Sequence, residues 1–496
     1  MIVQTAWQGT FDFFQPLPIV IEPSQGQLSS DAGLLPIRQF DETIGLTRHF
    51  AEALDDPRSP LFVQHSFLQM TRSRIYGILA DYEDQNDHDI LRSDPIFKLV
   101  AGGRSPEDAD LASQPTLSRF ENGVNIPSLF RLRDLFVDEF IASFATPPRT
   151  LTFDLDAVDD PTHGSQQLSL FHGLYDQYQY LPSFITCADN DQFVTIALRP
   201  GMVPASLGCD DDLRHLVIRL RKAWPNVRII LRGDAGYGVP IMYDVCEELA
   251  IEYTFGISTN PVLARRSDEL LQRAVAAFEE TRTPQRLCDA FAYQAGSWPA
   301  ERWVVVKVEV NQLGTNRRFL VTNRPGARVL PEAAYDDYAG RGESENRNKE
   351  IKCDLAMDRM SDHRFMANYF RLYLHAAAMN LLVRLRRTIA VPSADIALPA
   401  DVLSGGASEA PPDVPPEAWT GRARQAFFRA RRRRDPLGEG HPCTWRSLLI
   451  KVAAEVIVSS RRIVIRLSCN WPHLDLYADL VRRFGVSFVS NVSLSG

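Results

Sequence analysis

The chain has 496 residues, 45% of them hydrophobic and 23% charged, as in ordinary globular proteins, and its length suits about three or four domains. It contains no uninterrupted apolar run of about eighteen residues and no basic segment followed by an apolar one at its start, so the sequence predicts neither a membrane span nor a secretory signal. Its seven cysteines are scattered without a CxxC pair, which argues against a disulfide framework or a cysteine zinc site and favours a reducing cytoplasm.

Charge is distributed unevenly along the chain. The net charge of −8 taken alone argues against a nucleic-acid partner. Residues 420–496, however, hold fourteen Lys and Arg residues against five acidic ones, a net of +9, which leaves −17 for residues 1–419. Seven arginines surround two phenylalanines at 422–434. This run is either a solvated tail or a segment that contacts phosphates, so a polyanionic partner is compatible with the sequence.

The first 150 residues predict helices. Residues 1–60 mix short extended pieces with weak helical patterning, and from 61 to 144 apolar residues recur with helical spacing. A proline-led helix is expected from Ser113 to Arg119, either as a recognition helix or as an ordinary capped surface helix.

After Pro147 and Pro148 the pattern changes to a mixture of strands and helices. Strands are predicted at 151–158, 168–171, 193–198, 227–233 and 251–255, with helices at 211–222 and 239–249 between them. This order predicts a mixed sheet covered by helices. Residues 258–333 carry a strand–turn–strand pattern, and a long helix is expected from about 342 to 387. Residues 391–418 contain six prolines, five acids and no Lys or Arg, as in a linker.

Three acidic positions could carry chemistry. Asp154 and Asp156 lie on the same face of the 151–158 strand, opposite Phe153 and Leu155, which is costly unless they are solvated, paired or bound to a cation. Asp234 directly follows a buried strand, where ligand sites of such sheets gather, although an aspartate there can also simply cap the next helix. Together with a helical glutamate, such acids could hold one or two Mg²⁺ ions.

The glutamate lies in a regular pattern, Tyr338-x2-Arg341-x3-Glu345-x6-Lys352. At helical spacing Arg341, Glu345, Lys352 and Arg359 share one face. Periodicity alone does not separate a catalytic face from a solvent-exposed face of ion pairs.

Several motifs resemble the DDE-type transposases of bacterial insertion sequences, in the subset known as transposase DDE group 1. The resemblance rests on the Y-R-E-K pattern of residues 338–352 with the surrounding 341–368, and on the segments 82–95, 163–166 and 231–237, in the right order. It covers residues 33–472. Three features depart from the family: Val158 replaces a usual threonine, Asn348 stands where an apolar residue is usual, and the stretch at 391–418 is longer than expected.

The resemblance implies an α/β protein with an RNase H-like mixed-sheet core, a β-rich insertion and a preceding helical DNA-binding domain. It assigns Asp156, Asp234 and Glu345 as catalytic residues and metal ligands, and Tyr338, Arg341, Lys352 and Arg359 as DNA-binding residues. Asp156 is preferred to Asp154 as the first acid, and Asp154 remains the alternative. The expected divalent cation is Mg²⁺, with Mn²⁺ as a substitute.

The implied function is that of a DNA transposase. Such an enzyme binds the terminal inverted repeats of its element as a homodimer, hydrolyses the phosphodiester at each end and joins the ends to target DNA, in the cytoplasm at the nucleoid and away from membranes. A flipped base would need an aromatic platform, for which Trp298 or Trp303 is one choice, with a packing role as the alternative. The alternative function is a catalytically silent copy that represses transposition by occupying the ends.

The sequence and the resemblance together predict seven segments. They are an N-terminal arm (1–60), a helical DNA-binding domain (61–147), the first part of the core (148–257), the β-rich insertion (258–333), the second part of the core (334–390), an acidic proline-rich linker (391–419) and a basic C-terminal region (420–496).

Overall fold

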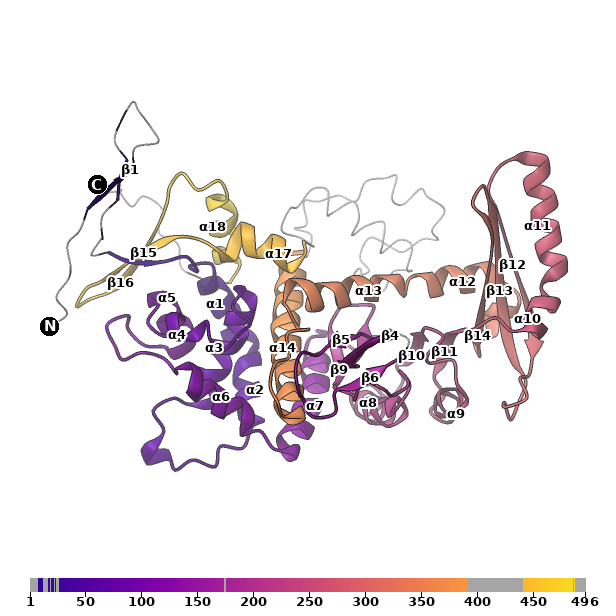
Figure 1. Cartoon of the computed structure of the whole chain (residues 1–496), viewed down its shortest axis with the longest axis horizontal. Helices are drawn as coiled ribbons and strands as arrows, with labels where there is room; N and C mark the ends of the chain where they lie inside the picture. The colour runs from indigo at the N-terminus through magenta and orange to yellow at the C-terminus, as the bar shows by residue number, and fades with distance from the viewer. Residues whose placement is uncertain are drawn as a thin grey trace.

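The computed structural model describes residues 26–173, 175–390 and 440–484, together with residues 8–11, 17, 19–21, 23 and 486. The linker predicted at 391–419 and the arginine-rich run at 422–434 lie outside the described residues. Figure 1 shows a helical region in which the N-terminal part of the chain meets the C-terminal part, a central sheet, and a group of strands and helices at the far end of that sheet.

The helical pattern predicted for 61–144 is confirmed. The helix at residues 67–79 is buried from Gln69 onward and lies within this helical region. The last helix of the region leads to the central sheet. The helices and turns are α1 (Leu34–Ile44), α2 (Leu46–Glu52), η1 (Pro60–Phe62), α3 (Phe67–Leu79), α4 (His88–Leu91), α5 (Pro95–Phe97), η2 (Lys98–Gly102), α6 (Gln114–Asn122) and α7 (Ile126–Ala142). The predicted proline-led helix is α6, which begins just after Ser113.

The C-terminal segment completes the helical region. It comprises α17 (Pro442–Trp445), η6 (Arg446–Ile450), β15 (Ala454–Val458), β16 (Ile463–Leu467) and α18 (Leu474–Arg483). β15 pairs with β16 and also with β3 (Gln27–Ser29), so one small antiparallel sheet joins segments from both ends of the chain. The sequence pattern of residues 444–488 predicts a helix, a strand at 462–467 and a second helix; the structure confirms these elements and adds β15, which the pattern does not predict. A further two-stranded sheet joins β1 (Gly9–Phe11) and β2 (Ile19–Ile21).

The central sheet has eight strands in the order β12-β13-β14-β11-β10-β4-β8-β9. β4 and β11 both pair in parallel with β10, and the other neighbours are antiparallel. The strands are β4 (Thr150–Ala157), β8 (Ser183–Cys187), β9 (Phe193–Ala197), β10 (Arg228–Gly233), β11 (Glu252–Ile257), β12 (Gln285–Tyr293), β13 (Arg302–Asn311) and β14 (Gly314–Thr322). This arrangement confirms the mixed sheet, and β8 is a strand that the sequence did not predict.

Helices cover both faces of the sheet. α8 (Cys209–Ala223) and α9 (Pro240–Glu248) lie on one side, while α12 (Pro331–Ala339) and α13 (Gly342–Lys349) run along the other (Figure 1). Residues Ile229 and Leu231 of β10 share a buried core with Leu213 and Leu216 of α8. Because side chains alternate along a strand, Asp154 of β4 and Arg232 of β10 face the opposite side, toward α12.

A small sheet is attached where β4 ends. β5 (Asp160–Pro161) follows β4 after two residues and pairs with β7 (Gln177–Tyr180), which in turn pairs with β6 (Leu170–His172). This sheet therefore stands beside the carboxyl end of β4.

The segment predicted as a β-rich insertion contains helices as well as strands. α10 (Pro261–Arg266) and α11 (Asp268–Thr281) precede β12, and a short turn, η3 (Pro325–Arg328), follows β14. Asn260 starts α10 by accepting hydrogen bonds from the backbone N–H groups of Val262 and Leu263 at 3.0 and 2.9 Å. The three strands extend the central sheet, since β14 pairs directly with β11.

The expectation of one helix from about 342 to 387 is wrong. α13 continues through a π-helical turn, η4 (Glu350–Asp354), and the helix then stops because Ala356 adopts a left-handed conformation with φ of 53°. A new helix, α14 (Phe365–Ala390), begins after Asp362, whose Oδ1 accepts a hydrogen bond from the backbone N–H of Arg364 at 2.9 Å. Arg359 lies between the two helices.

Candidate active site

Asp156 lies near the carboxyl end of β4 and faces α13. Its Oδ2 accepts a hydrogen bond from Asn348 Nδ2 at 2.9 Å and lies 3.5 Å from Ser344 Oγ. Arg341 Nη1 is 3.6 Å from the same oxygen. Three side chains at the start and along one side of α13 therefore converge on this one carboxylate.

Asp154, the alternative first acid, is occupied elsewhere. It is 2% exposed and forms a two-point ion pair with Arg232 on the neighbouring strand. Arg232 also donates to the backbone carbonyl of Asp337 at 2.6 Å. Asp154 thus holds β4, β10 and α12 together, which leaves Asp156 as the acid of this strand that faces the candidate site.

Asp234 directly follows β10 in a tight turn. Its Oδ1 accepts a hydrogen bond from the backbone N–H of Gly236 at 2.8 Å. The neighbouring strand approaches this turn so closely that a Cβ on Gly256 would lie 2.9 Å from the nitrogen of Ala235 and 3.1 Å from Tyr338 Oη. A side chain at Gly256 would therefore push apart the turn that carries Asp234 and the helix that carries Tyr338.

Glu345 projects from the first turn of α13 with its side chain 55% exposed. Arg341, one helical turn earlier, donates from Nη2 to Glu345 Oε1 at 3.0 Å. Since Arg341 also reaches Asp156, its guanidinium bridges the acid of β4 and the acid of α13.

The charges of the three acids and of Arg341 act on one another. Burial raises the pKa of Asp156 to about 6; the Arg341 charge opposes this rise, and the negative charges of Asp234 and Glu345 add to it. Burial lowers the pKa of Arg341, but the net shift is upward because of Tyr338 and the carboxylates of Asp156, Glu345 and Asp234. The guanidinium of Arg341 therefore contacts the carboxylates of Asp156 and Glu345 and is within the electrostatic range of Asp234.

Two predicted DNA-binding residues lie at this site and two lie outside it. Tyr338 is half-buried, with the Arg341 guanidinium carbon 5.9 Å from the centre of its ring. Lys352 is held by Asp159, through the backbone carbonyl at 2.8 Å and the carboxylate at 3.1 Å. Arg359 does not share the helix face as expected, because the helix ends before it, and its exposed side chain pairs with Glu83 of the helical region.

The proposed tryptophan platforms have packing roles. Trp298 is 8% exposed and packs edge-on against Tyr243 and Tyr293, with ring centres 5.2 and 5.3 Å away. Trp303 lies under the guanidinium of Arg328 at 5.2 Å. Trp298 is therefore part of the core and has no face free for a base.

Sequence reasoning missed the roles of Asn348 and Ser344. Both are buried residues of α13 that contact Asp156. Asn348 follows Glu345 by three residues, so its place on the same side of the helix could have been found from the spacing. Its Oδ1 is buried without a hydrogen-bond partner.

The acids are not arranged as a ready-made metal site. Within the part of the chain that the structure describes, no group of three His, Cys, Asp or Glu side chains is placed to hold a metal ion. The guanidinium of Arg341 contacts both Asp156, at 3.6 Å, and Glu345, at 3.0 Å. The donor set, three carboxylates and a neighbouring amide oxygen, nevertheless fits a hard cation such as Mg²⁺.

Comparison with known proteins gives a family for this chain. A search among curated proteins found no match. No helix in the described ranges combines the length and the apolar character needed to cross a lipid bilayer. Residues 14–397, which include all three acids, match the family described as transposase DDE domain group 1, and the chain belongs to that family.

Proposed function

We propose that the protein is a DNA transposase that binds the terminal inverted repeats of its own element, cleaves the phosphodiester at each end and transfers the ends to target DNA. The observation that carries the proposal is the arrangement of the acids about Arg341, which contacts Asp156 and Glu345 directly and is within the electrostatic range of Asp234. These residues come from β4, the end of β10 and α13, and lie up to 189 positions apart in the sequence.

The strand order supports an RNase H-like core. β9, β8 and β4 form an antiparallel set, and β10 and β11 follow in parallel with β4. Counted along the chain, these five strands are β4, β8, β9, β10 and β11. Asp156 therefore lies on the first of them, and Asp234 directly follows the fourth. This is the arrangement expected from the resemblance, with β12, β13 and β14 as the insertion.

A divalent cation would be held by Asp156, Asp234 and Glu345. Bound there, it would activate the attacking oxygen and stabilise the leaving oxygen of the phosphodiester. Asn348 orients the Asp156 carboxylate through its 2.9 Å hydrogen bond. Arg341 and Tyr338 are placed beside the acids, where a guanidinium and a phenol can contact phosphate oxygens of the DNA.

Recognition of the ends is assigned to the helical region. α6 starts with polar residues and exposes Arg119, while its apolar residues Leu117 and Phe120 are buried. The net charge of +9 over residues 420–496 adds a basic segment to this acidic chain. A homodimer would hold both ends of the element in one complex.

Strand cleavage tests this function. The full chain is incubated with a labelled duplex that carries the inverted repeats flanking its coding region, with Mg²⁺ or Mn²⁺. We expect nicking at the repeat end and loss of nicking in Asp234→Asn and Glu345→Gln, with end binding retained in both. Binding without cleavage by the wild-type protein would instead support the silent, repressing copy, and cleavage by either variant at the wild-type rate would overturn the triad.

A further inference from the structure

Arg232 and Arg341 contact carboxylates of β4, and the two arginines are bound very differently. Arg232 donates to both oxygens of Asp154 at 2.6 and 2.8 Å and to the carbonyl of Asp337 at 2.6 Å. Arg341 lies 3.6 Å from Asp156 and 3.0 Å from Glu345, and its buried Nε has no hydrogen-bond partner. Every nitrogen of the Arg232 guanidinium thus has a hydrogen-bond partner, whereas Arg341 has one hydrogen bond to Glu345, one long contact with Asp156 and a nitrogen without a partner.

The surroundings of Arg341 favour a cation of higher charge. The carboxylates of Asp156, Glu345 and Asp234 all act to raise the pKa of Arg341, and the charges of this cluster also act on Tyr338 and, together with Asp159, on Tyr175. A single positive charge leaves the cluster with an excess of negative charge. Carboxylates that cannot all be neutralised by one partner repel each other, and a divalent ion relieves that repulsion more completely.

Arg341 can leave at low cost. It is 15% exposed, and Glu345, which provides its shorter contact, is 55% exposed. The Arg341–Glu345 pair therefore contributes little to stability because water replaces it readily, and the contact of Arg341 with Asp156 is long, at 3.6 Å. Asp156 meanwhile keeps its hydrogen bond from Asn348, so its carboxylate stays oriented when the guanidinium moves.

From these contacts we infer that Arg341 is a positioning residue that stands in for the divalent cation: it holds Asp156 and Glu345 apart in the metal-free protein, competes with the cation for them, and is displaced when the cation binds. The inference rests on the proposed metal-dependent function. This role differs from that of an arginine that only binds DNA phosphate, because Arg341 would compete with the cation for Asp156 and Glu345 even in the absence of DNA.

Titration of the full, metal-free protein with Mn²⁺ alone tests the competition. The free Mn²⁺ is followed by electron paramagnetic resonance. We expect Arg341→Gln to bind Mn²⁺ about tenfold more tightly than the wild type, because a competing charge is removed from the site. Arg341→Lys keeps the charge but loses the two-point geometry, so its affinity for Mn²⁺ should lie between those of the wild type and of Arg341→Gln. Lys349→Gln removes an exposed charge from the same helix and is the matched control, with affinity close to that of the wild type.

Asp156→Asn separates this inference from the proposed function. If Asp156→Asn does not weaken Mn²⁺ binding, the metal site itself is wrong. If it does weaken binding while Arg341→Gln binds Mn²⁺ no more tightly than the wild type, the metal site stands and the stand-in role of Arg341 is overturned.

A second measurement uses the unmodified chain and so does not depend on the folding of a variant. Arginines are labelled with phenylglyoxal and each site is quantified by mass spectrometry. Mn²⁺ should raise labelling of Arg341 several-fold, while Arg347, which pairs with buried Glu350 at 3.0 Å, stays unchanged. Equal labelling of Arg341 with and without Mn²⁺ would show that the guanidinium is not displaced.

Discussion

Arg232 and Asp154 form a two-point ion pair between adjacent parallel strands, with nitrogen–oxygen distances of 2.6 and 2.8 Å and almost no exposure of either side chain. The pair joins β4 to β10 just before each strand reaches its candidate catalytic acid. It therefore fixes β4 against β10 beside Asp156 and Asp234, and it leaves Asp156 as the acid of β4 that we propose for catalysis.

This pair predicts opposite phenotypes for two neighbouring substitutions. Asp154→Asn leaves the Arg232 charge buried without a charged partner and should lower the free energy of unfolding by about 3–5 kcal/mol. Asp156→Asn removes a carboxylate that burial and two other acids already destabilise, so it should not lower stability. Urea denaturation measures the stability of both variants. Strand cleavage by the folded proteins measures their activity: Asp156→Asn should be inactive, and Asp154→Asn should retain cleavage. The reverse outcome would make Asp154 the first acid.

Asn348 is expected to tune the protonation of Asp156. Its amide donates to Asp156 Oδ2 and favours the ionised form, so Asn348→Leu should raise the pKa of Asp156 further above its value of about 6 in the metal-free protein. Nuclear magnetic resonance of the labelled carboxyl carbon measures that pKa directly. Asn346→Leu is the control, because Asn346 contacts Glu343 instead. If the pKa of Asp156 is the same in Asn348→Leu as in the wild type, Asn348 does not tune the protonation of Asp156.

Asp160 predicts a pH dependence of stability. It is fully buried, neither carboxylate oxygen has a hydrogen-bond partner, and its pKa is raised well above the usual value, mainly by burial and then by the charge of Asp358. Between the unfolded and folded pKa values the folded chain keeps a proton that the unfolded chain loses, so stability falls as pH rises through that range. Asp160→Asn should stabilise the protein at neutral pH and remove this part of the pH dependence. Thermal unfolding of the wild type and of Asp160→Asn at a series of pH values measures both effects. A lower stability of Asp160→Asn than of the wild type at neutral pH would contradict this prediction.

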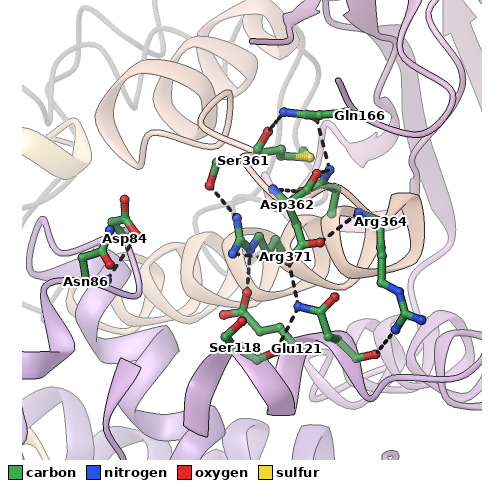
Figure 2. Close-up of polar contacts among 12 residues, drawn as sticks. Asp84, Asn86, Ser118, Glu121, Gln166, Ser361, Asp362, Arg364 and Arg371 are labelled. Atoms are coloured by element: carbon green, nitrogen blue, oxygen red, sulfur yellow. Dashed lines mark hydrogen bonds and ion pairs between the residues drawn. The ribbon is translucent and has the colours of Figure 1, made fainter. Parts of the chain in front are cut away.

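The ion pairs of Glu121 join the helical region to α14, so we expect replacement of Glu121 to lower stability. It is fully buried between Arg74 of α3 and Arg371 of α14, at 2.7 and 2.5 Å. Figure 2 shows Arg371 reaching both Glu121 and Ser361, next to Asp362, in the connection that replaces the expected long helix. Glu121→Gln would remove the carboxylate that two buried guanidinium groups share at short distance, and should cost about 3–5 kcal/mol in urea unfolding. Glu52→Gln, an exposed change on α2, is the control; similar stabilities of the two variants would refute the role.

The local parts of this fold could be predicted from the sequence. β4 and β10 are visible as an alternating and a buried apolar run, and α8 and α9 follow from helical spacing. Asp234 could be placed at the end of a strand by the same reasoning. The choice of Glu345, and the preference for Asp156 over Asp154, came from the resemblance, since periodicity left both open.

What the sequence did not predict depends on contacts between distant segments. β15 pairs with its neighbour β16 and also with β3, more than 400 residues earlier, and local pattern carries no information about that second partner. The break after Asp354 depends on one left-handed residue, Ala356, and on the polar contacts of Asp362. The pairing of Arg232 with Asp154 required the register of β4 against β10.

The most direct test of the central claim is a crystal structure of the full chain soaked with Mn²⁺, with data collected at the manganese absorption edge. The account predicts an anomalous peak coordinated by carboxylate oxygens of Asp156 and Asp234, with Glu345 beside it and the Arg341 guanidinium moved away. A peak elsewhere, or none at a Mn²⁺ concentration that supports cleavage, would contradict it.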